Sequence, residues 1–228
     1  KDNAAEMLDK ELSREKWDKK LTVNLSTVTD PYQPAERQFK ITRNVLKVFL
    51  KHHNALMVTT KSDLILRDLD ILSEIAQTGF LNVVLTIPAM DEDLRRKVEP
   101  NAPSISRRVG ILNELHSAGV TVGVAAIPLF PYISDGEDDL GRLIKTFAEN
   151  GADYVIVDLL NFREEARGRF MEFIRNNYPD LAPKYEELYT TNYCDKGYAK
   201  QIRGYANKLI KEYKVGNYDK MFSYRKGV

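Results

Sequence analysis

The feature of this sequence that most constrains its fold is a regular alternation of short apolar segments with longer amphipathic ones. The apolar segments cover residues 21–26, 55–60, 80–87, 120–127 and 152–160. Segments of helical periodicity lie between them, and Gly79 and Gly119 are placed to end two of these. The almost wholly apolar segment 120–127 is typical of a strand that is buried on both faces. The alternation predicts five parallel strands joined by right-handed helical crossovers.

A further helix is predicted ahead of the first strand, over residues 4–17, with Asn3 placed to cap its first turn. Pro34 suits the first turn of another helix, which continues to Phe49. The leading helix implies an earlier strand that is missing from this chain. The predicted fold class is therefore α/β, a partial parallel (βα)6-type barrel lacking its first strand. A doubly wound sheet is the competing architecture, and local periodicity does not choose between them.

The composition changes near residue 181, so we expect a partial barrel over residues 1–180 and a C-terminal extension over 181–228. The extension holds eight of the twelve tyrosines, and residues 195–228 carry nine Lys and Arg against three Asp and Glu. A helix is predicted over residues 198–213. We expect the extension to pack on the barrel, without forming another βα unit. Nucleic-acid binding through its cations and aromatic rings is a second interpretation.

Charge and cysteine content restrict the class of protein. The net charge of +1 gives no general reason to expect a nucleic-acid or acidic partner. The single cysteine, Cys194, leaves no intrachain disulfide to form, which favours a reducing compartment, and we expect a cytoplasmic protein. No apolar run approaches the roughly 20 residues that cross a bilayer, so no membrane partner is expected. Because the chain begins at Lys1 and directly in a predicted helix, we expect it to be part of a longer polypeptide.

Four motifs follow one another along the predicted strands and helices. They are residues 26–34 (Ser-Thr-Val-Thr-Asp-Pro-Tyr-Gln-Pro), residues 60–68 (Thr-Lys-Ser-Asp-Leu-Ile-Leu-Arg-Asp), residues 99–104 (Glu-Pro-Asn-Ala-Pro-Ser) followed by Arg108, and Ala-Gly-Val at 118–120 leading to Ala-Ile-Pro at 126–128. In this order and spacing they resemble the radical S-adenosylmethionine enzymes. The resemblance is to the branch related to spore photoproduct lyase and the DNA repair photolyase-like proteins, and it spans about residues 3–160.

The resemblance implies two cofactors, S-adenosylmethionine and a [4Fe–4S] cluster. In the family, a Cys-x3-Cys-x2-Cys loop holds the cluster, whose reduction cleaves S-adenosylmethionine to a 5′-deoxyadenosyl radical. This chain has no such triad, and Cys194 alone cannot hold a cluster. We therefore expect the cluster ligands upstream of Lys1, outside this chain, and no metal ligands within it. A degenerate homologue that never had a cluster is the alternative.

The resemblance also implies the residues that bind S-adenosylmethionine. Thr29 and Asp30 would hold its amino group and ribose hydroxyls through charge-assisted hydrogen bonds. Lys61 would pair with its carboxylate or with Asp30. The structural alternatives are an Asp-Pro turn in which Asp30 ties down its own backbone, and a solvated lysine at a strand terminus.

Three further positions complete the predicted cofactor site. Thr86 would face the amino-acid end of the ligand, and Arg108 would form a bidentate contact with its carboxylate, oriented by Glu99. Ile127 would contact the adenine. The alternatives are a β-branched strand residue for Thr86, an exposed side chain for Arg108, and plain strand core for Ile127. No catalytic residue is assigned.

The predicted function is the core of a lyase-like radical S-adenosylmethionine enzyme, inactive without its cluster segment. An electron donor such as flavodoxin or ferredoxin would be a partner. In spore photoproduct lyase a cysteine near the position of Thr29 and Asp30 donates hydrogen, and this chain has none between residues 24 and 34. The substrate therefore stays open. The alternatives are an inactive barrel that binds a nucleoside-like ligand or a partner protein, and an ordinary (βα) lyase or aldolase. The lysine nucleophile of the latter would need an apolar pocket, for which Lys61 is poorly placed beside Asp63 and Asp30.

Overall fold

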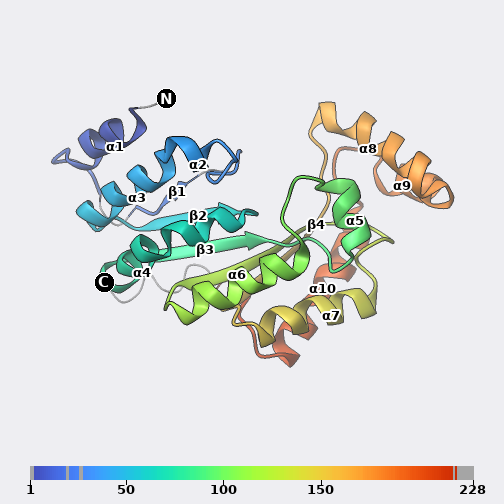
Figure 1. Cartoon of the computed structure of the whole chain (residues 1–228). Helices are drawn as coiled ribbons and strands as arrows, with labels where there is room; N and C mark the ends of the chain where they lie inside the picture. The colour runs from blue at the N-terminus through green and yellow to red at the C-terminus, as the bar shows by residue number, and fades with distance from the viewer. Residues whose placement is uncertain (1–2, 19–20, 26–27, 218, 220–228) are drawn as a thin grey trace.

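The computed structural model describes residues 3–18, 21–25, 28–217 and 219, and its centre is a parallel sheet. The sheet contains five strands in sequential order, all paired in parallel: β1 (Val23–Leu25), β2 (Leu56–Thr60), β3 (Leu81–Thr86), β4 (Thr121–Leu129) and β5 (Tyr154–Leu159). Helices connect successive strands (Figure 1). The predicted α/β class and strand order are confirmed.

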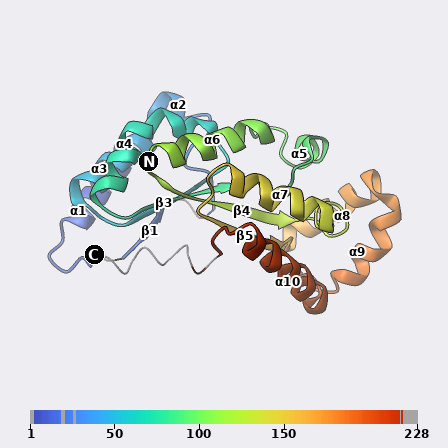
Figure 2. The same cartoon turned by 90° about the horizontal axis from the view of Figure 1, so that it is seen from below.

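Helices cover one face of the sheet, as the two views of the molecule show (Figures 1 and 2). They are α3 (Ile41–His52), α4 (Leu69–Thr78), α6 (Ile105–Ser117) and α7 (Glu137–Glu149). Their apolar faces form the main core with strand side chains such as Val58, Leu85 and Val124, which are completely buried. A separate, smaller apolar cluster is built on Val84, Ala125 and Tyr154, on the alternate positions of the strands. The sheet therefore keeps a second face, the inner face of a partial barrel.

Tyr154 lies across this inner face. Its hydroxyl donates a hydrogen bond to Asn82 Oδ1 on β3 at 2.8 Å, and its ring passes over Gly123 on the intervening strand. A Cβ atom at position 123 would come within 2.1 Å of the ring. Glycine at this position is therefore a packing requirement.

The structure corrects three local expectations. Asn3 precedes α1 (Ala4–Leu12), but its side chain makes no capping hydrogen bond. The helix expected from Pro34 to Phe49 is divided into α2 (Glu36–Phe39) and α3, because Lys40 adopts a left-handed conformation with φ of 52°. The Glu36 side chain caps the amino end of α3, because its carboxylate accepts hydrogen bonds from the backbone N–H groups of Thr42 and Arg43. The chain after β2 begins as a 3-10 helix, η1 (Asp63–Asp68), before α4 starts.

The remaining helices lie beyond the carboxyl ends of the strands or in the C-terminal extension. They are α5 (Glu92–Val98), α8 (Glu164–Asn177), η2 (Pro179–Leu181), α9 (Ala182–Leu188) and α10 (Lys196–Glu212). α10 packs against α7 and β5. The chain after it returns to the sheet, where Gly216 forms a parallel bridge with Tyr154 at the edge of β5. The extension thus packs on the barrel as expected and also joins the sheet, which the sequence did not predict; its boundary at residue 180 stays a prediction.

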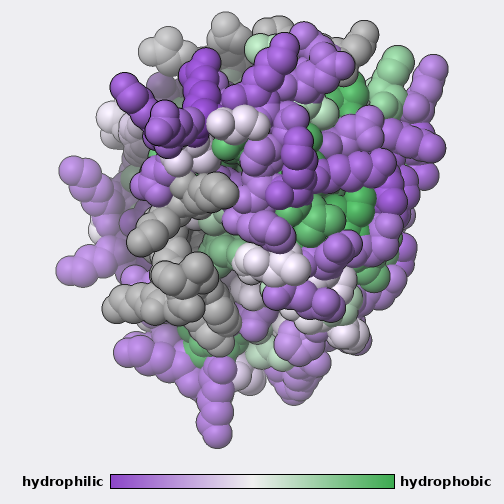
Figure 3. Space-filling model, turned by 90° about the vertical axis from the view of Figure 1, so that its left-hand side faces the viewer, coloured by the Kyte–Doolittle hydropathy of each residue, from purple (hydrophilic) through white to green (hydrophobic). Residues whose placement is uncertain are grey.

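The side of the molecule at the amino ends of the strands is predominantly hydrophilic, with smaller apolar areas between the polar side chains (Figure 3). Within the described ranges, the structure contains no helix with the length and apolar character needed to span a membrane. Cys194 is buried with its thiol free.

We expect Gly123→Ala to lower the free energy of unfolding by about 1–3 kcal/mol, because the added methyl group overpacks the Tyr154 ring. Gly110→Ala in α6 is the matched control. A Cβ at position 110 has no neighbouring atom within 4 Å, so helix propensity should raise stability by up to about 1 kcal/mol. Urea denaturation of both variants measures the difference, and equal stabilities would contradict the packing of Tyr154 described above.

Candidate functional site

Asp30 connects the loop after β1 to the end of β2. Its Oδ1 accepts hydrogen bonds from the Tyr32 backbone N–H at 2.8 Å and from Thr60 Oγ1 at 2.7 Å. Its Oδ2 accepts one from the Lys61 backbone N–H at 2.8 Å. The carboxylate thus forms the local turn expected as the structural alternative and also fixes the neighbouring strand end. These three bonds give Asp30 a structural role, whether or not it also meets a ligand.

Lys61, Glu99, Arg108 and Thr86 form a continuous chain of polar contacts at the carboxyl ends of β2 and β3. The Lys61 ammonium pairs with Glu99 Oε1. The second oxygen of the same carboxylate, Oε2, accepts a hydrogen bond from Arg108 Nη1 at 2.9 Å. Arg108 Nη1 also donates to the carbonyl oxygen of Thr86 at 2.8 Å. Glu99 thus contacts Arg108 as expected and also reaches Lys61, whereas its role in orienting Arg108 toward a ligand stays a prediction.

Lys61 and Arg108, the two cations in this series of polar contacts, differ in exposure. The Lys61 side chain is 42% exposed, whereas Arg108 is completely buried. Arg108 Nε and Nη2 have no hydrogen-bond partner among the described residues. Burying a hydrogen-bond donor without an acceptor costs free energy. These two nitrogens therefore still lack acceptor oxygens. The alternative that Arg108 is simply an exposed side chain is wrong.

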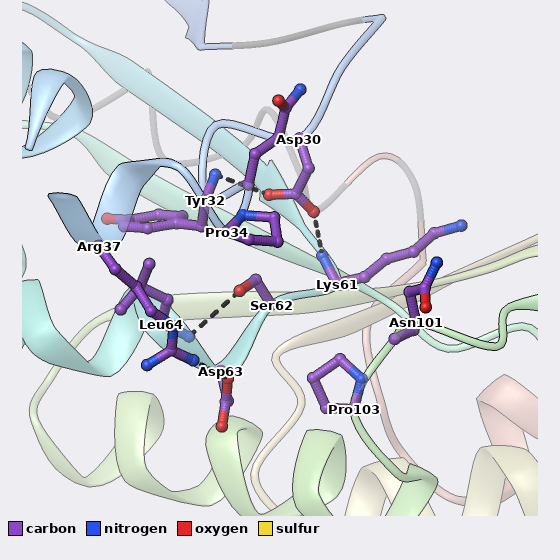
Figure 4. Close-up of a pocket in the computed structure, with 12 residues that line it drawn as sticks. Asp30, Tyr32, Pro34, Arg37, Lys61, Ser62, Asp63, Leu64, Asn101 and Pro103 are labelled. Atoms are coloured by element: carbon purple, nitrogen blue, oxygen red, sulfur yellow. Dashed lines mark hydrogen bonds and ion pairs between the residues drawn. The ribbon is translucent and has the colours of Figure 1, made fainter. Parts of the chain in front are cut away.

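A pocket of about 290 Å³ opens beside Asp30 and Lys61 (Figure 4). Its walls come from the loop after β1, from the start of η1 and from the segment at 101–103. In the close-up the Asp30 carboxylate turns toward the Lys61 backbone, while the Lys61 side chain extends toward Asn101. Thr86, Arg108 and Ile127 do not line this pocket.

The remaining predicted residues also lie near the carboxyl ends of the strands. Thr29 is exposed and directly precedes Asp30. Thr86 ends β3 and is 9% exposed. Ile127 packs on the inner face with Val84 and Ala125, close to the carboxyl end of β4. The structure thus brings Asp30, Lys61, Thr86 and Arg108 together and leaves Ile127 as a separate apolar contact.

A buried charged cluster lies behind this rim, and its contacts could not be predicted from the charges in the sequence alone. Asp68 is completely buried and accepts hydrogen bonds from Arg43 Nη1 at 2.8 Å and Arg67 Nε at 2.9 Å. Arg67 also donates to Glu36 Oε1 at 2.8 Å. Burial, together with the nearby Asp68 carboxylate, raises the pKa of Tyr32, so its phenol stays neutral. The cluster joins η1 to α2 and thereby holds the loop that carries Asp30.

Within the described parts of the chain, no group of three or more His, Cys, Asp and Glu side chains could hold a metal ion.

Comparison with known proteins gives longer relatives in sequence and solved structures of the same fold. No protein-family model matches the sequence. An uncharacterized protein of Mycobacterium tuberculosis is 32% identical over 216 residues, which cover 94% of this chain and 63% of the relative. An uncharacterized protein of Methanocaldococcus jannaschii is 32% identical over 158 residues, covering 69% of this chain and 57% of the relative. The chain therefore spans less than two thirds of these relatives.

Among solved structures, a mutant of spore photoproduct lyase matches with a TM-score of 0.66 at 16% identity, covering 95% of this chain and 65% of that one. SuiB from Streptococcus suis, bound to S-adenosylmethionine, matches with a TM-score of 0.54 at 14% identity, covering 79% of this chain and 36% of that one. The chain therefore shares its fold with spore photoproduct lyase and SuiB. The resemblance predicted from the motifs is thus confirmed by the fold.

In a partial barrel of this kind, the carboxyl ends of the parallel strands form the rim at which ligands of α/β barrels are held. Asp30, Lys61, Thr86 and Arg108 all lie at that rim. Their convergence agrees with the predicted site, whereas their contact with a ligand stays a prediction.

Glu99→Gln should lower the free energy of unfolding by about 1–3 kcal/mol, because it leaves the buried Arg108 guanidinium without its anion. Glu114→Gln is the matched control, since Glu114 pairs with Arg107 where both side chains are more than 40% exposed. The control should change stability by about 0–1 kcal/mol. Chemical denaturation of both variants at one pH measures this, and a Glu99→Gln variant as stable as the control would contradict the bridging role of Glu99.

Proposed function

We propose that this chain is the S-adenosylmethionine-binding core of a radical S-adenosylmethionine enzyme. The observation that carries the proposal is the chain of contacts from Lys61 through Glu99 to Arg108, at the rim of a sheet with this fold. Fold alone does not define a ligand, so the proposed ligand is identified from the chemistry of these side chains.

The residues present fit an amino-acid nucleoside. Lys61 offers a partly exposed ammonium, and Arg108 has two nitrogens without acceptors, so together they can meet a ligand carboxylate. The Glu99 carboxylate contacts both cations, and the Asp30 carboxylate lies against the Lys61 backbone, so we propose that these two groups accept hydrogen bonds from the ammonium group of the ligand. Because Arg108 is fully buried, we propose that Lys61 is the first group to meet the ligand and that Arg108 is reached only when Lys61 and Glu99 move apart.

The apolar end of the ligand would lie on the inner face of the sheet. Ile127, with Ala125 and Ile156, presents an apolar surface near the carboxyl end of β4. We propose that this surface contacts the adenine, and that Thr29 and Thr86 contribute hydroxyl groups near the amino-acid end.

The proposed enzyme also needs a [4Fe–4S] cluster, and the described residues offer no ligand set for one. We propose that the cluster ligands belong to polypeptide outside this chain. With a reduced cluster, bound S-adenosylmethionine would supply a 5′-deoxyadenosyl radical. The residues named here would only bind and orient S-adenosylmethionine. An electron donor such as flavodoxin or ferredoxin would be required.

The substrate is not determined by the fold. The structural neighbours include spore photoproduct lyase with a dinucleoside spore photoproduct and SuiB with a precursor peptide, so one fold accommodates very different substrates. A lyase-like reaction is proposed here only at the level of the fold.

Lys61→Met should weaken S-adenosylmethionine binding by about tenfold, equivalent to about 1.4 kcal/mol, because the cation closest to solvent at the rim is lost. Lys145→Met, on the exposed face of α7, is the matched control and should bind like the unaltered chain. Isothermal titration calorimetry measures both affinities, and thermal melting checks that both variants are folded.

Asp30→Ala is a poorer test, because loss of its three hydrogen bonds should lower stability as well as any affinity. The proposal fails if Lys61→Met and Lys145→Met bind S-adenosylmethionine equally well, or if the unaltered chain does not bind it.

A further inference from the structure

A second cavity lies beyond the carboxyl ends of β4 and β5, apart from the pocket beside Asp30. This cleft, of about 350 Å³, is bounded by the last turn of α5, by α8 and by the segments that leave the two strands. α5 and α8 lie next to each other at this end of the sheet (Figure 1). Its volume is within the range of small-molecule sites.

Aromatic rings form the floor of the cleft. Phe130 follows β4 directly and stacks on Phe170 with the ring centroids 5.7 Å apart. Phe173 extends this surface, 5.5 Å from Phe170. Phe170 and Phe173 remain partly exposed although they lie next to a fully apolar interior. Partly exposed ring faces in a concave site favour a flat apolar group that can stack on them.

Two cations stand at the edge of the cleft, and they are the ionisable side chains that line it. Both Lys97 and Arg169 are exposed, and neither forms an ion pair within the described parts of the chain. The Lys97 ammonium lies 5.2 Å from the centre of the Tyr178 ring. An aromatic ring holds a cation in place without cancelling its charge, so this charge remains available to an anion.

We propose that this cleft binds a small planar aromatic anion, with the ring on Phe170 and Phe173 and the anionic group between Lys97 and Arg169. Aromatic carboxylates and nucleoside phosphates share this chemistry. The cleft adjoins the proposed cofactor rim along the chain, since α5 ends at Val98 and the next residue is Glu99. A role as substrate site depends on the proposed function, whereas binding to the cleft does not.

The first test fills the cleft without removing any of its groups. Ala166 lines the cleft from an exposed position on α8, and Ala166→Trp should block it. The probe is 1-anilinonaphthalene-8-sulfonate, a flat aromatic anion whose fluorescence rises in an apolar site. Ala166→Trp should weaken probe binding by at least about tenfold, or about 1.4 kcal/mol. Gln201→Trp, at an exposed position on α10, is the control and should bind normally. Binding by Ala166→Trp within twofold of the control would overturn the proposal.

The second test separates charge from apolar contact. The double variant Lys97→Gln/Arg169→Gln should weaken binding of the anionic probe by about tenfold, while the uncharged analogue N-phenyl-1-naphthylamine should bind within about twofold of the unaltered chain. Lys200→Gln/Lys208→Gln on α10 removes the same net charge at exposed positions away from the cleft and should change neither affinity. An equal loss for both probes, or no loss for the anionic one, would overturn the anionic part of the proposal.

The third test distinguishes the two sources of the anion. Indole-3-acetate and adenosine monophosphate are titrated against the bound anionic probe in the presence of the unaltered chain. Displacement by either supports the proposed chemistry and shows which anionic group is preferred, and displacement by neither contradicts it. None of these tests requires S-adenosylmethionine, so failure here is distinguishable from failure of the proposed cofactor site.

Discussion

The carboxylate of Glu99 is the constraint on which the arrangement of the rim depends. One of its oxygens meets Lys61 and the other meets Arg108, so a single side chain joins the end of β2 to helix α6. Arg108 is completely buried, and a buried guanidinium needs an anion in contact with it. Since Arg108 also holds the carbonyl of Thr86, loss of Glu99 would release the end of β3 as well. The ends of two neighbouring strands are thus positioned by one charge.

Carboxylates of the same kind fix the first part of the rim. Asp30 binds the backbone at the end of β2, and the cluster of Glu36, Arg67 and Asp68 holds the loop that carries Asp30. Buried ion pairs of this kind contribute little net stability compared with apolar packing, but they penalise any arrangement in which a charge loses its partner. We infer that these groups specify the geometry of the rim more than they stabilise the fold.

The sequence predicts the sheet well because apolar periodicity and glycine stops are local signals. Gly79 ends α4 as expected. The break at Lys40 was not predictable, because it depends on the Glu36 carboxylate reaching forward to Thr42 and Arg43.

The site shows the same division between local and long-range information. The family resemblance located Asp30, Lys61, Thr86 and Arg108, and these residues do converge. The burial of Arg108 was not predicted, because it depends on contacts between elements that lie far apart in the chain. The aromatic cleft beside α5 was missed for the same reason, since Phe130 and Phe170 come from segments 40 residues apart in the sequence.

The central claim is that Lys61 and the two free nitrogens of Arg108 bind the carboxylate of S-adenosylmethionine. A crystal structure of the chain with S-adenosylmethionine tests this most directly. We expect the carboxylate oxygens of S-adenosylmethionine within hydrogen-bond distance of Lys61 Nζ and of Arg108 Nε or Nη2, with the adenine against Ile127. Ligand density elsewhere on the molecule, with Arg108 still bound only to Glu99 and Thr86, would contradict it.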